Sequence, residues 1–185
     1  LEKFTDETGI KVNVLFAGKG LVHKMVQEGD SSPVDVLLTV DIGRLSDAVN
    51  QEVSQSFSSS VVNANIPSQY RDPDGHWVGL TARARVVYAS IDRVAQDEIT
   101  YEELAGPEWA GRLCTRSGQN AYNLALFASL IAHHGEAETI EWLKGVKANM
   151  ARTPQGNDRG QVKGIFSGEC DISIGNTYYM AKMRT

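Results

Sequence analysis

The segment GECDISIGNTYYMAKM, residues 168–183, gives the strongest indication of the fold. Its apolar centre, Ile172–Gly175, has the composition of a short buried strand, and the Asn-Thr pair that follows allows a turn or a helix start. Two adjacent tyrosines, Tyr178 and Tyr179, come directly afterwards. In open α/β sheets, ligands bind at the carboxyl ends of the strands. The segment therefore predicts an α/β fold with two phenols at its ligand-binding edge.

A comparable pattern lies upstream, where the apolar run 113–115 precedes Tyr122. Tyr122 and Tyr178 are 56 residues apart, and so are the only two cysteines, Cys114 and Cys170. If the two strands are parallel neighbours, their tyrosines emerge together at one edge of the sheet. The cysteines form a disulfide if their Cα atoms come within about 7 Å, and are otherwise two small buried residues. The sequence leaves both possibilities open.

Composition excludes several classes of protein. With 185 residues, 42% hydrophobic and 22% charged, the chain suits a globular protein of one or two domains. Its net charge of −5 argues against nucleic acid as a partner, because phosphate neutralisation needs clustered Lys and Arg. No apolar run approaches the roughly 20 residues of a membrane helix, and the chain opens without a signal-peptide pattern. A mature secreted protein would also lack its signal, so this absence does not indicate the cytoplasm.

Short β-rich runs alternate with helical segments along the chain. Helices are expected at 1–8, 21–28, 42–49, 101–104, 120–133, 136–147 and shortly after 158. Strands are expected at 11–16, 33–40, 77–89, 111–116 and 170–174. Strands separated by helices imply mainly parallel sheets flanked by helices. We expect two lobes, 1–80 and 81–185, with the long run at 77–89 crossing between them.

Segments along almost the whole chain resemble the periplasmic ferric-iron-binding proteins of bacterial ABC transporters. The segments that carry this resemblance are FTDETGIKVNVL, SPVDVLLTVDIGRL, RDPDGHWVGLTARARVVY, YEELAGPEWAGRL, RSGQNAYNLALFASLIAHHGE, ANMARTPQGND and GECDISIGNTYYMAKM. The resemblance implies a two-lobed, type II periplasmic-binding fold with Fe(III) in the interlobe cleft. It places Tyr122, Tyr178 and Tyr179 on the three tyrosines that ligate iron from the second lobe. It also implies an ABC permease as membrane partner, and no catalysis.

The chemistry of these residue types agrees with that implication. Fe(III) is a small, highly charged cation that prefers hard anionic oxygen donors, and phenolate is one. A free tyrosine has a pKa near 10, so the metal must displace the phenol proton and affinity falls as pH falls. Three phenolates would cancel the charge of the ion. Water or a small anion such as carbonate would fill the remaining positions.

Several polar residues are candidates to hold such an anion or to balance phenolate charge. Ser117 and Asn120 precede the helix that carries Tyr122, and a helix start offers backbone N–H groups to an anion. Asn176 stands similarly before Tyr178. Arg83 and Arg85 lie two apart on the crossover run and point alike if it is a strand. The resemblance favours Arg83 slightly.

Other residues that invite a functional interpretation are better explained by structure. The pair His133-His134 at a helix end suits the C-terminal dipole, since adjacent helical positions do not easily share one ion. Asp41 is either a residue that lines the cleft or, more simply, the N-cap of the helix from residue 42. The remaining tyrosines are interpreted as packing residues: Tyr70, Tyr88 and Tyr101.

Two rival functions stay open at this point. One is a binding protein of the same fold for a polyamine, sulfate or another metal, and the other is an α/β enzyme with tyrosine as acid or base. The enzyme is disfavoured, because neither a cofactor motif nor a Ser/His/Asp set is present. We expect a monomer in the periplasm, or an extracellular lipoprotein in a Gram-positive source. Since family members have an earlier strand and later helices, we also expect this chain to be a fragment.

Overall fold

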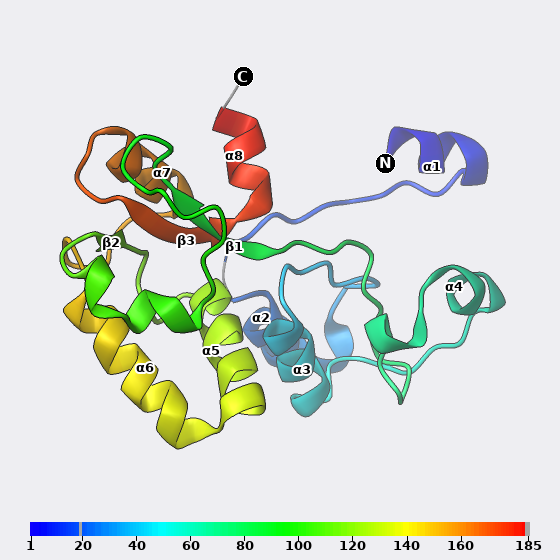
Figure 1. Cartoon of the computed structure of the whole chain (residues 1–185). Coiled ribbons are helices and arrows are strands. Elements are labelled where there is room, and N and C mark those ends of the chain that lie inside the picture. The colour runs from blue at the N-terminus through cyan, green and yellow to red at the C-terminus, as the bar shows by residue number, and fades with distance from the viewer. Residues whose placement is uncertain (19, 184–185) are drawn as a thin grey trace. The chain divides into compact units, whose positions relative to one another are not determined.

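The computed structural model describes residues 1–18 and 20–183, with side chains at 181 and 182 not described (Figure 1). The chain divides into two compact units, Leu1–Val78 and Gly79–Thr185. That these units act as the two lobes of a receptor stays a prediction. None of the helices in the described residues has both the length and the apolar character needed to cross a membrane.

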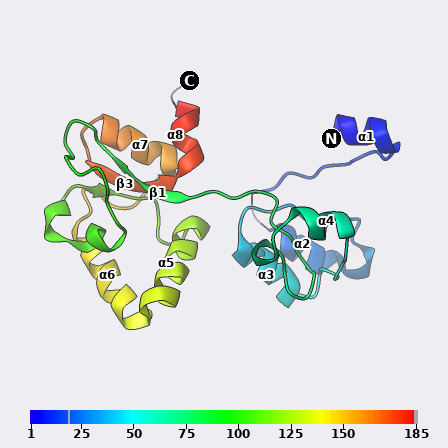
Figure 2. The same cartoon turned by 45° about the vertical axis from the view of Figure 1, so that its right-hand side comes forward.

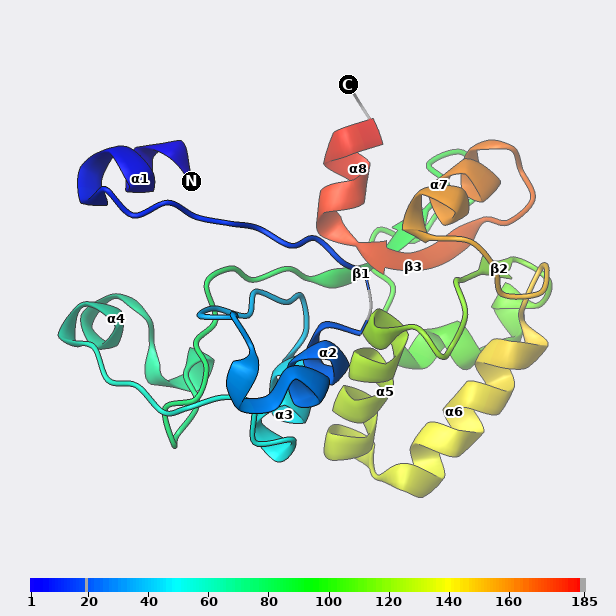
Figure 3. The same cartoon turned by 180° about the vertical axis from the view of Figure 1, so that it is seen from behind.

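The first unit is built from short helices. Their bounds are α1 (Glu2–Thr8), α2 (Leu21–Glu28), α3 (Ile42–Asn50) and α4 (Ser60–Asn65), with 3₁₀ turns at Gly29–Ser31 and Ser68–Tyr70. Helices α2 and α3 lie side by side and bury Met25 and Ala48 (Figure 3). The Asp41 side chain accepts a hydrogen bond from the backbone N–H of Gly43 at 2.9 Å, which confirms its prediction as the N-cap of α3.

The strands predicted at 11–16 and 33–40 do not form in the described residues of this unit. Both segments run as irregular chain (Figure 2). Their apolar side chains are exposed, at 88% for Phe16, 82% for Val36 and 75% for Leu38. A strand requires a neighbour that accepts its backbone hydrogen bonds, and the described residues supply none to these segments. Segments 11–16 and 33–40 therefore have the composition of strands but lack a strand to pair with among the described residues.

The second unit contains a three-stranded sheet. Its strands are β1 (Arg85–Ala89), β2 (Leu113–Cys114) and β3 (Ile172–Asn176), in the spatial order β1-β3-β2. Strands β2 and β3 are parallel, with Leu113 opposite Ile172. Strands β1 and β3 are antiparallel, with Val87 opposite Ile174. All five residues of the central strand β3 are buried.

Two details of the sheet differ from the sequence prediction. The sheet is mixed rather than mainly parallel. Strand β1 is not joined to β3 by a single helical crossover, and it pairs in the antiparallel direction with the edge of β3 that β2 does not occupy. An antiparallel edge strand on a parallel pair is a common arrangement. The long run predicted at 77–89 is a strand only from Arg85 onward. Before it, Val78 forms one isolated bridge with Arg71, and residues 79–84 have no ladder partner among the described residues.

Helices cover both faces of this sheet. Their bounds are α5 (Ala121–His134), α6 (Glu136–Ala148), α7 (Asp158–Phe166) and α8 (Thr177–Met183), with 3₁₀ turns at Glu102–Ala105 and Pro107–Trp109. Helices α5 and α6 lie on one side of the sheet and α7 on the other (Figures 1 and 3). The main core joins α5 and α6 to β2 and β3 through Leu104, Trp109, Leu113, Leu126, Leu130, Trp142, Val146, Ile172 and Ile174.

The predicted end of α5 is confirmed. His133 and His134 occupy its last turn, and Gly135 follows with φ of 85°. His133 Nδ1 lies 2.7 Å from the carbonyl oxygen of Ser129, and His134 Nε2 lies 2.9 Å from a carboxylate oxygen of Glu102. Both histidines therefore have local structural partners.

Cys114 and Cys170 form a disulfide, with their Cα atoms 5.8 Å apart. The bridge ties β2 to the residues just before β3 and is buried against Tyr88 and Ile165. Of the two possibilities that the sequence left open, the structure shows the disulfide. It cross-links β2 to the segment that leads into β3, and both strands precede the tyrosine-bearing helices.

Candidate metal centre

Tyr122 and Tyr178 occupy equivalent places in two successive strand–helix units. Each is the second residue of a helix, α5 or α8, that follows one of the parallel strands. The spacing of 56 residues corresponds to these helix starts and not to the strand register, in which Leu113 pairs with Ile172 at an offset of 59. Because β2 and β3 are adjacent, both helices begin at the same edge of the sheet.

The three predicted phenols lie together at this edge. The Tyr178 phenol interacts with the phenols of both Tyr122 and Tyr179 closely enough to change the pKa of each. The rings of Tyr178 and Tyr179 are 4.4 Å apart between centroids and tilted by 38°. Adjacent residues of a strand would point to opposite faces, but α8 begins at Thr177, so both side chains reach one site. Their role as metal ligands stays a prediction.

The three phenols differ in acidity. Burial opposes ionisation of Tyr178, but hydrogen bonds from Tyr122, Tyr179 and Asn176 and the charge of Arg83 outweigh burial and lower its pKa. Burial and the hydrogen bond with Tyr178 raise the pKa of Tyr122. The hydrogen bond with Tyr178, together with burial, raises the pKa of Tyr179 to about 12. Tyr178 is therefore the first of the three to become a phenolate.

Three guanidinium groups surround the Tyr122 ring. The Cζ atoms of Arg83, Arg116 and Arg85 lie 4.9, 5.2 and 5.9 Å from its centroid. Arg83 and Arg85 were predicted from the sequence, and the structure brings both to this ring. Positive charge at these distances favours the ionised form of a phenol and can also hold an anion. A cation without phenolates or an accompanying anion would be repelled here.

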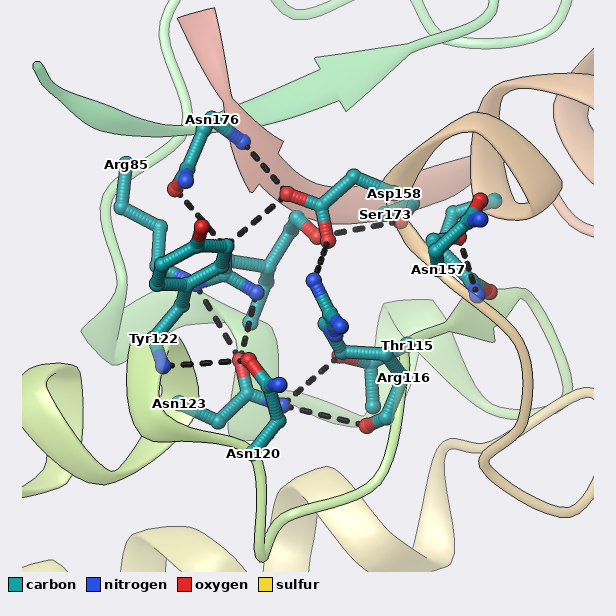
Figure 4. A network of polar contacts seen from close by, with 12 residues as sticks. Arg85, Thr115, Arg116, Asn120, Tyr122, Asn123, Asn157, Asp158, Ser173 and Asn176 are labelled. Carbon is teal, nitrogen blue, oxygen red and sulfur yellow. Dashed lines mark hydrogen bonds and ion pairs between the residues drawn. The ribbon is translucent and has the colours of Figure 1, made fainter. Parts of the chain in front are cut away.

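Arg85 is fixed by polar partners from three segments (Figure 4). Its Nε donates to the side-chain oxygen of Asn123 at 3.1 Å. One terminal nitrogen donates to Asn176 Oδ1 at 2.9 Å and to Asp158 Oδ2 at 3.2 Å. Burial lowers the pKa of Arg85 and the charge of Asp158 opposes that effect. The guanidinium is thus oriented by the network and not by solvent.

The predicted N-terminal residues of the two helices have different partners. Asn120 Oδ1 accepts from the backbone N–H of Tyr122 at 3.0 Å, as expected for the cap of α5. Ser117 is exposed, and its hydroxyl accepts from the backbone N–H of Gln119 at 3.2 Å. The backbone N–H of Asn176 donates to Asp158 at 2.9 Å, and a role of Asn176 in holding an anion stays a prediction. Its side chain contacts Arg85 and donates to the Tyr178 hydroxyl at 3.3 Å.

Tyrosines predicted as packing residues support the same sheet edge. Tyr88 is buried, and its hydroxyl donates to the carbonyl of Asn176. The Tyr101 hydroxyl donates to the carbonyl of Arg85. Tyr70 is half exposed in the first unit. For Tyr88 and Tyr101 the packing interpretation is confirmed.

Sequence reasoning missed three residues of the network: Arg116, Asn123 and Asp158. Arg116 had a usable signal, since it is a cation at the end of the predicted strand 111–116 and shortly before a helix cap. Asn123 had a weaker one, as a polar residue one position beyond Tyr122. Asp158 had none, because an acidic residue in the first turn of a helix is ordinarily explained by the helix dipole. Asp158 is in fact fully buried.

The phenol cluster is the best candidate metal centre in the described part of the chain. Within residues 1–18 and 20–183, the His, Cys, Asp and Glu side chains form no group of three or more that could hold a metal ion. The tyrosines offer three hard oxygen donors next to fixed positive charge. Such a set suits a hard, highly charged cation accompanied by an anion.

Known proteins with similar sequences carry names related to iron. The chain is 48% identical over 184 residues to iron uptake protein A1 of Synechocystis, covering 98% of this chain and 51% of that protein. It is 30% identical over 182 residues to the Fe(3+)-binding periplasmic protein of Serratia marcescens, covering 97% and 53%. The chain thus spans about half the length of the curated relatives it matches.

Solved structures show the same fold. The apo ferric ion-binding protein A of Pasteurella haemolytica superposes with a TM-score of 0.92 at 53% identity, covering 98% of this chain and 58% of that one. A Trichodesmium protein in complex with iron and citrate gives a TM-score of 0.92 at 43% identity, covering 99% and 58%. The predicted type II periplasmic-binding fold is therefore confirmed for the part of it that the chain spans.

The sequence profile of one protein family matches nearly the whole chain. The sequence profile of the family described as bacterial extracellular solute-binding protein matches residues 15–185. The match includes both strand–helix units and all three tyrosines. The chain belongs to the family of bacterial extracellular solute-binding proteins.

Proposed function

We propose that the protein is a periplasmic receptor that captures Fe(III) through Tyr122, Tyr178 and Tyr179 and delivers it to an ABC permease in the membrane, without catalysing a reaction. The observation that carries this proposal is the convergence of three phenol hydroxyls from two helix starts, beside the guanidinium groups that surround the Tyr122 ring. The names of its relatives, which include an Fe(3+)-binding periplasmic protein, support both the ion and the compartment.

The order of phenol acidities suggests how the ion is taken up. Tyr178 loses its proton most easily, because its neighbours donate hydrogen bonds to the phenolate. Fe(III) bound to this oxygen then lowers the pKa of the other two phenols, as metal ions do for their ligands. Capture therefore releases protons, and the three phenolates together match the charge of the ion.

A small anion is proposed to complete the coordination shell. Arg83 and Arg116 lie near the Tyr122 ring, and positive charge at these distances can hold an anion. Carbonate fits the need for a compact oxyanion. The Trichodesmium relative was solved with iron and citrate, so a carboxylate anion is the second candidate.

Titration of the full-length protein with Fe(III) tests the proposal. Phenolate ligation produces an intense visible charge-transfer band, and the triple variant Tyr122→Phe/Tyr178→Phe/Tyr179→Phe should abolish it. Tyr70→Phe, a half-exposed tyrosine of the first unit, is the matched control and should leave the band unchanged. A wild-type protein without the band, or a band that survives in the triple variant, would disprove the proposal.

Acid should release the ion. Because bound phenolates must be reprotonated, the free protein binds more protons than the iron complex, and affinity falls as pH falls. The charge-transfer band measured against pH should therefore bleach on acidification. A band independent of pH would contradict phenolate ligation.

A further inference from the structure

We propose that Asp158 is a positioning residue that holds the two tyrosine-bearing helix starts in one arrangement, an inference that rests on the proposed function. Its carboxylate contacts Arg85, Arg116 and Asn176 (Figure 4), and through them both sides of the phenol cluster. One side is α5, which carries Tyr122. The other is the junction of β3 and α8, which carries Tyr178 and Tyr179.

Asp158 acts on the Tyr122 side through two arginines. Asp158 Oδ2 accepts from Arg85 at 3.2 Å, and Oδ1 accepts from Arg116 at 3.1 Å. Both guanidinium groups lie over the Tyr122 ring. Arg85 also donates to Asn123, the residue next to Tyr122 on α5. A change at Asp158 therefore reaches the Tyr122 ring through both arginines.

The side toward the tyrosine pair is reached directly through the backbone. Asp158 Oδ2 accepts from the N–H of Asn176 at 2.9 Å. Asn176 is the last residue of β3, and α8 begins at the next residue. Its side chain donates to the Tyr178 hydroxyl at 3.3 Å. The same carboxylate oxygen thus fixes Arg85 and the start of the helix that carries the pair.

Burial makes these contacts strong constraints. The Asp158 side chain is fully buried, and the side chains of Arg85 and Arg116 are only 10% and 14% exposed. Removing one member of a buried ion pair leaves the other charge uncompensated, so the arginines must move or admit water. Partners that orient metal ligands commonly change metal affinity about 10- to 100-fold when they are removed.

The chain contains a matched control for this arrangement. Asp171 also lies between two arginines, accepting from Arg93 at 2.5 Å and from Arg112 at 2.6 Å. Its side chain is 17% exposed, and none of its contacts involves the tyrosines. Asp158→Asn and Asp171→Asn therefore remove the same charge from the same kind of bridge. Only the first bridge joins the two helix starts.

The first experiment measures Fe(III) affinity and the charge-transfer band for the full-length protein and these two variants. We expect Asp158→Asn to bind about 10- to 100-fold more weakly with a shifted band, and Asp171→Asn to keep both properties. Equal behaviour of the two variants would overturn the inference. A wild-type protein that shows no band would instead disprove the proposed function, so the two failures are distinguishable.

A second variant, Arg116→Gln, keeps the inference testable even if Asp158→Asn does not fold. Loss of a positive charge near the phenols would by itself strengthen the binding of a cation. Loss of the contact that positions Tyr122 should weaken it and shift the band. Weaker binding that excess bicarbonate does not restore supports the positioning role. Stronger binding, or restoration by bicarbonate, would show a purely electrostatic or anion-holding role and overturn the inference.

Discussion

The two compact units differ in whether their strand-forming sequences have partners. In Gly79–Thr185, a sheet, flanking helices and a disulfide enclose a core that includes the fully buried Leu113 and Ile172. In the described residues of Leu1–Val78, the predicted strands stay irregular and expose Phe16 and Val36. Both units contain apolar runs with strand-like composition.

This difference shows that a segment with strand-like composition forms a strand only where a neighbouring strand pairs with it. Segment 170–174 became β3 because β1 and β2 pair with its two edges. Segment 33–40 has no such neighbour among the described residues. The candidate metal centre depends on this distinction, since Tyr122 and Tyr178 are positioned by helices that begin where paired strands end.

Removing the disulfide should give the largest change in stability and should affect the second unit only. The bridge closes a separation of 56 residues, for which the loop-entropy relation predicts a loss of about 4 kcal/mol in Cys114→Ala/Cys170→Ala. Urea unfolding can be followed separately in variants that retain only the buried Trp109 of the second unit or only Trp77 of the first. The Trp109 midpoint should fall and the Trp77 midpoint should not. Equal falls would mean that the units unfold together.

Two leucines, one in each unit, test whether side chains in the paired strands contribute more to stability than side chains in the unpaired segments. Leu113→Ala removes a fully buried side chain from β2 and should cost about 3 kcal/mol. Leu38→Ala changes a side chain that is 75% exposed in a predicted strand, and should cost less than about 0.5 kcal/mol. Denaturant unfolding of the full-length protein measures both. A large cost at Leu38 would show that residues beyond those described here cover segment 33–40.

Local sequence signals were sufficient for most of the second unit. The bounds of α5 and α6 follow from apolar periodicity and from recognisable ends, with Asn120 as the cap and Gly135 as the break. The helix start after β3 was predictable from the requirement that Tyr178 and Tyr179 share a site. These features depend on neighbours along the chain, which the sequence displays directly.

Features that depend on distant neighbours were not predictable. The antiparallel direction of β1 follows from its pairing with β3, nearly 90 residues later. Asp158 looks like a helix-dipole charge, yet it binds arginines 73 and 42 residues away. Whether 11–16 and 33–40 form strands likewise depends on partners that local composition cannot specify. The candidate ligands were therefore easier to find than the network that orients them.

Tyr88 gives a smaller, pH-dependent effect within the second unit. Burial, the leading cause, raises its pKa from 10.0 to about 12. Between these pH values the unfolded chain has lost the phenol proton while the folded protein keeps it, so the free energy of unfolding falls as pH rises. At neutral pH, Tyr88→Phe should cost about 2 kcal/mol because the buried carbonyl of Asn176 loses its donor. That cost should shrink as pH rises through the window, and a constant cost would contradict the raised pKa.

The smallest effect comes from two helix caps, one in each unit. Asp41 accepts from the N–H of Gly43 at the start of α3, and Asn157 accepts from the N–H of Gly160 at the start of α7. Both helices have nine residues, and each change to Ala should cost about 1 kcal/mol. If the units are independent, Asp41→Ala lowers only the Trp77 transition and Asn157→Ala only the Trp109 transition. Because α7 also carries Asp158, Asn157→Ala should in addition weaken Fe(III) binding slightly.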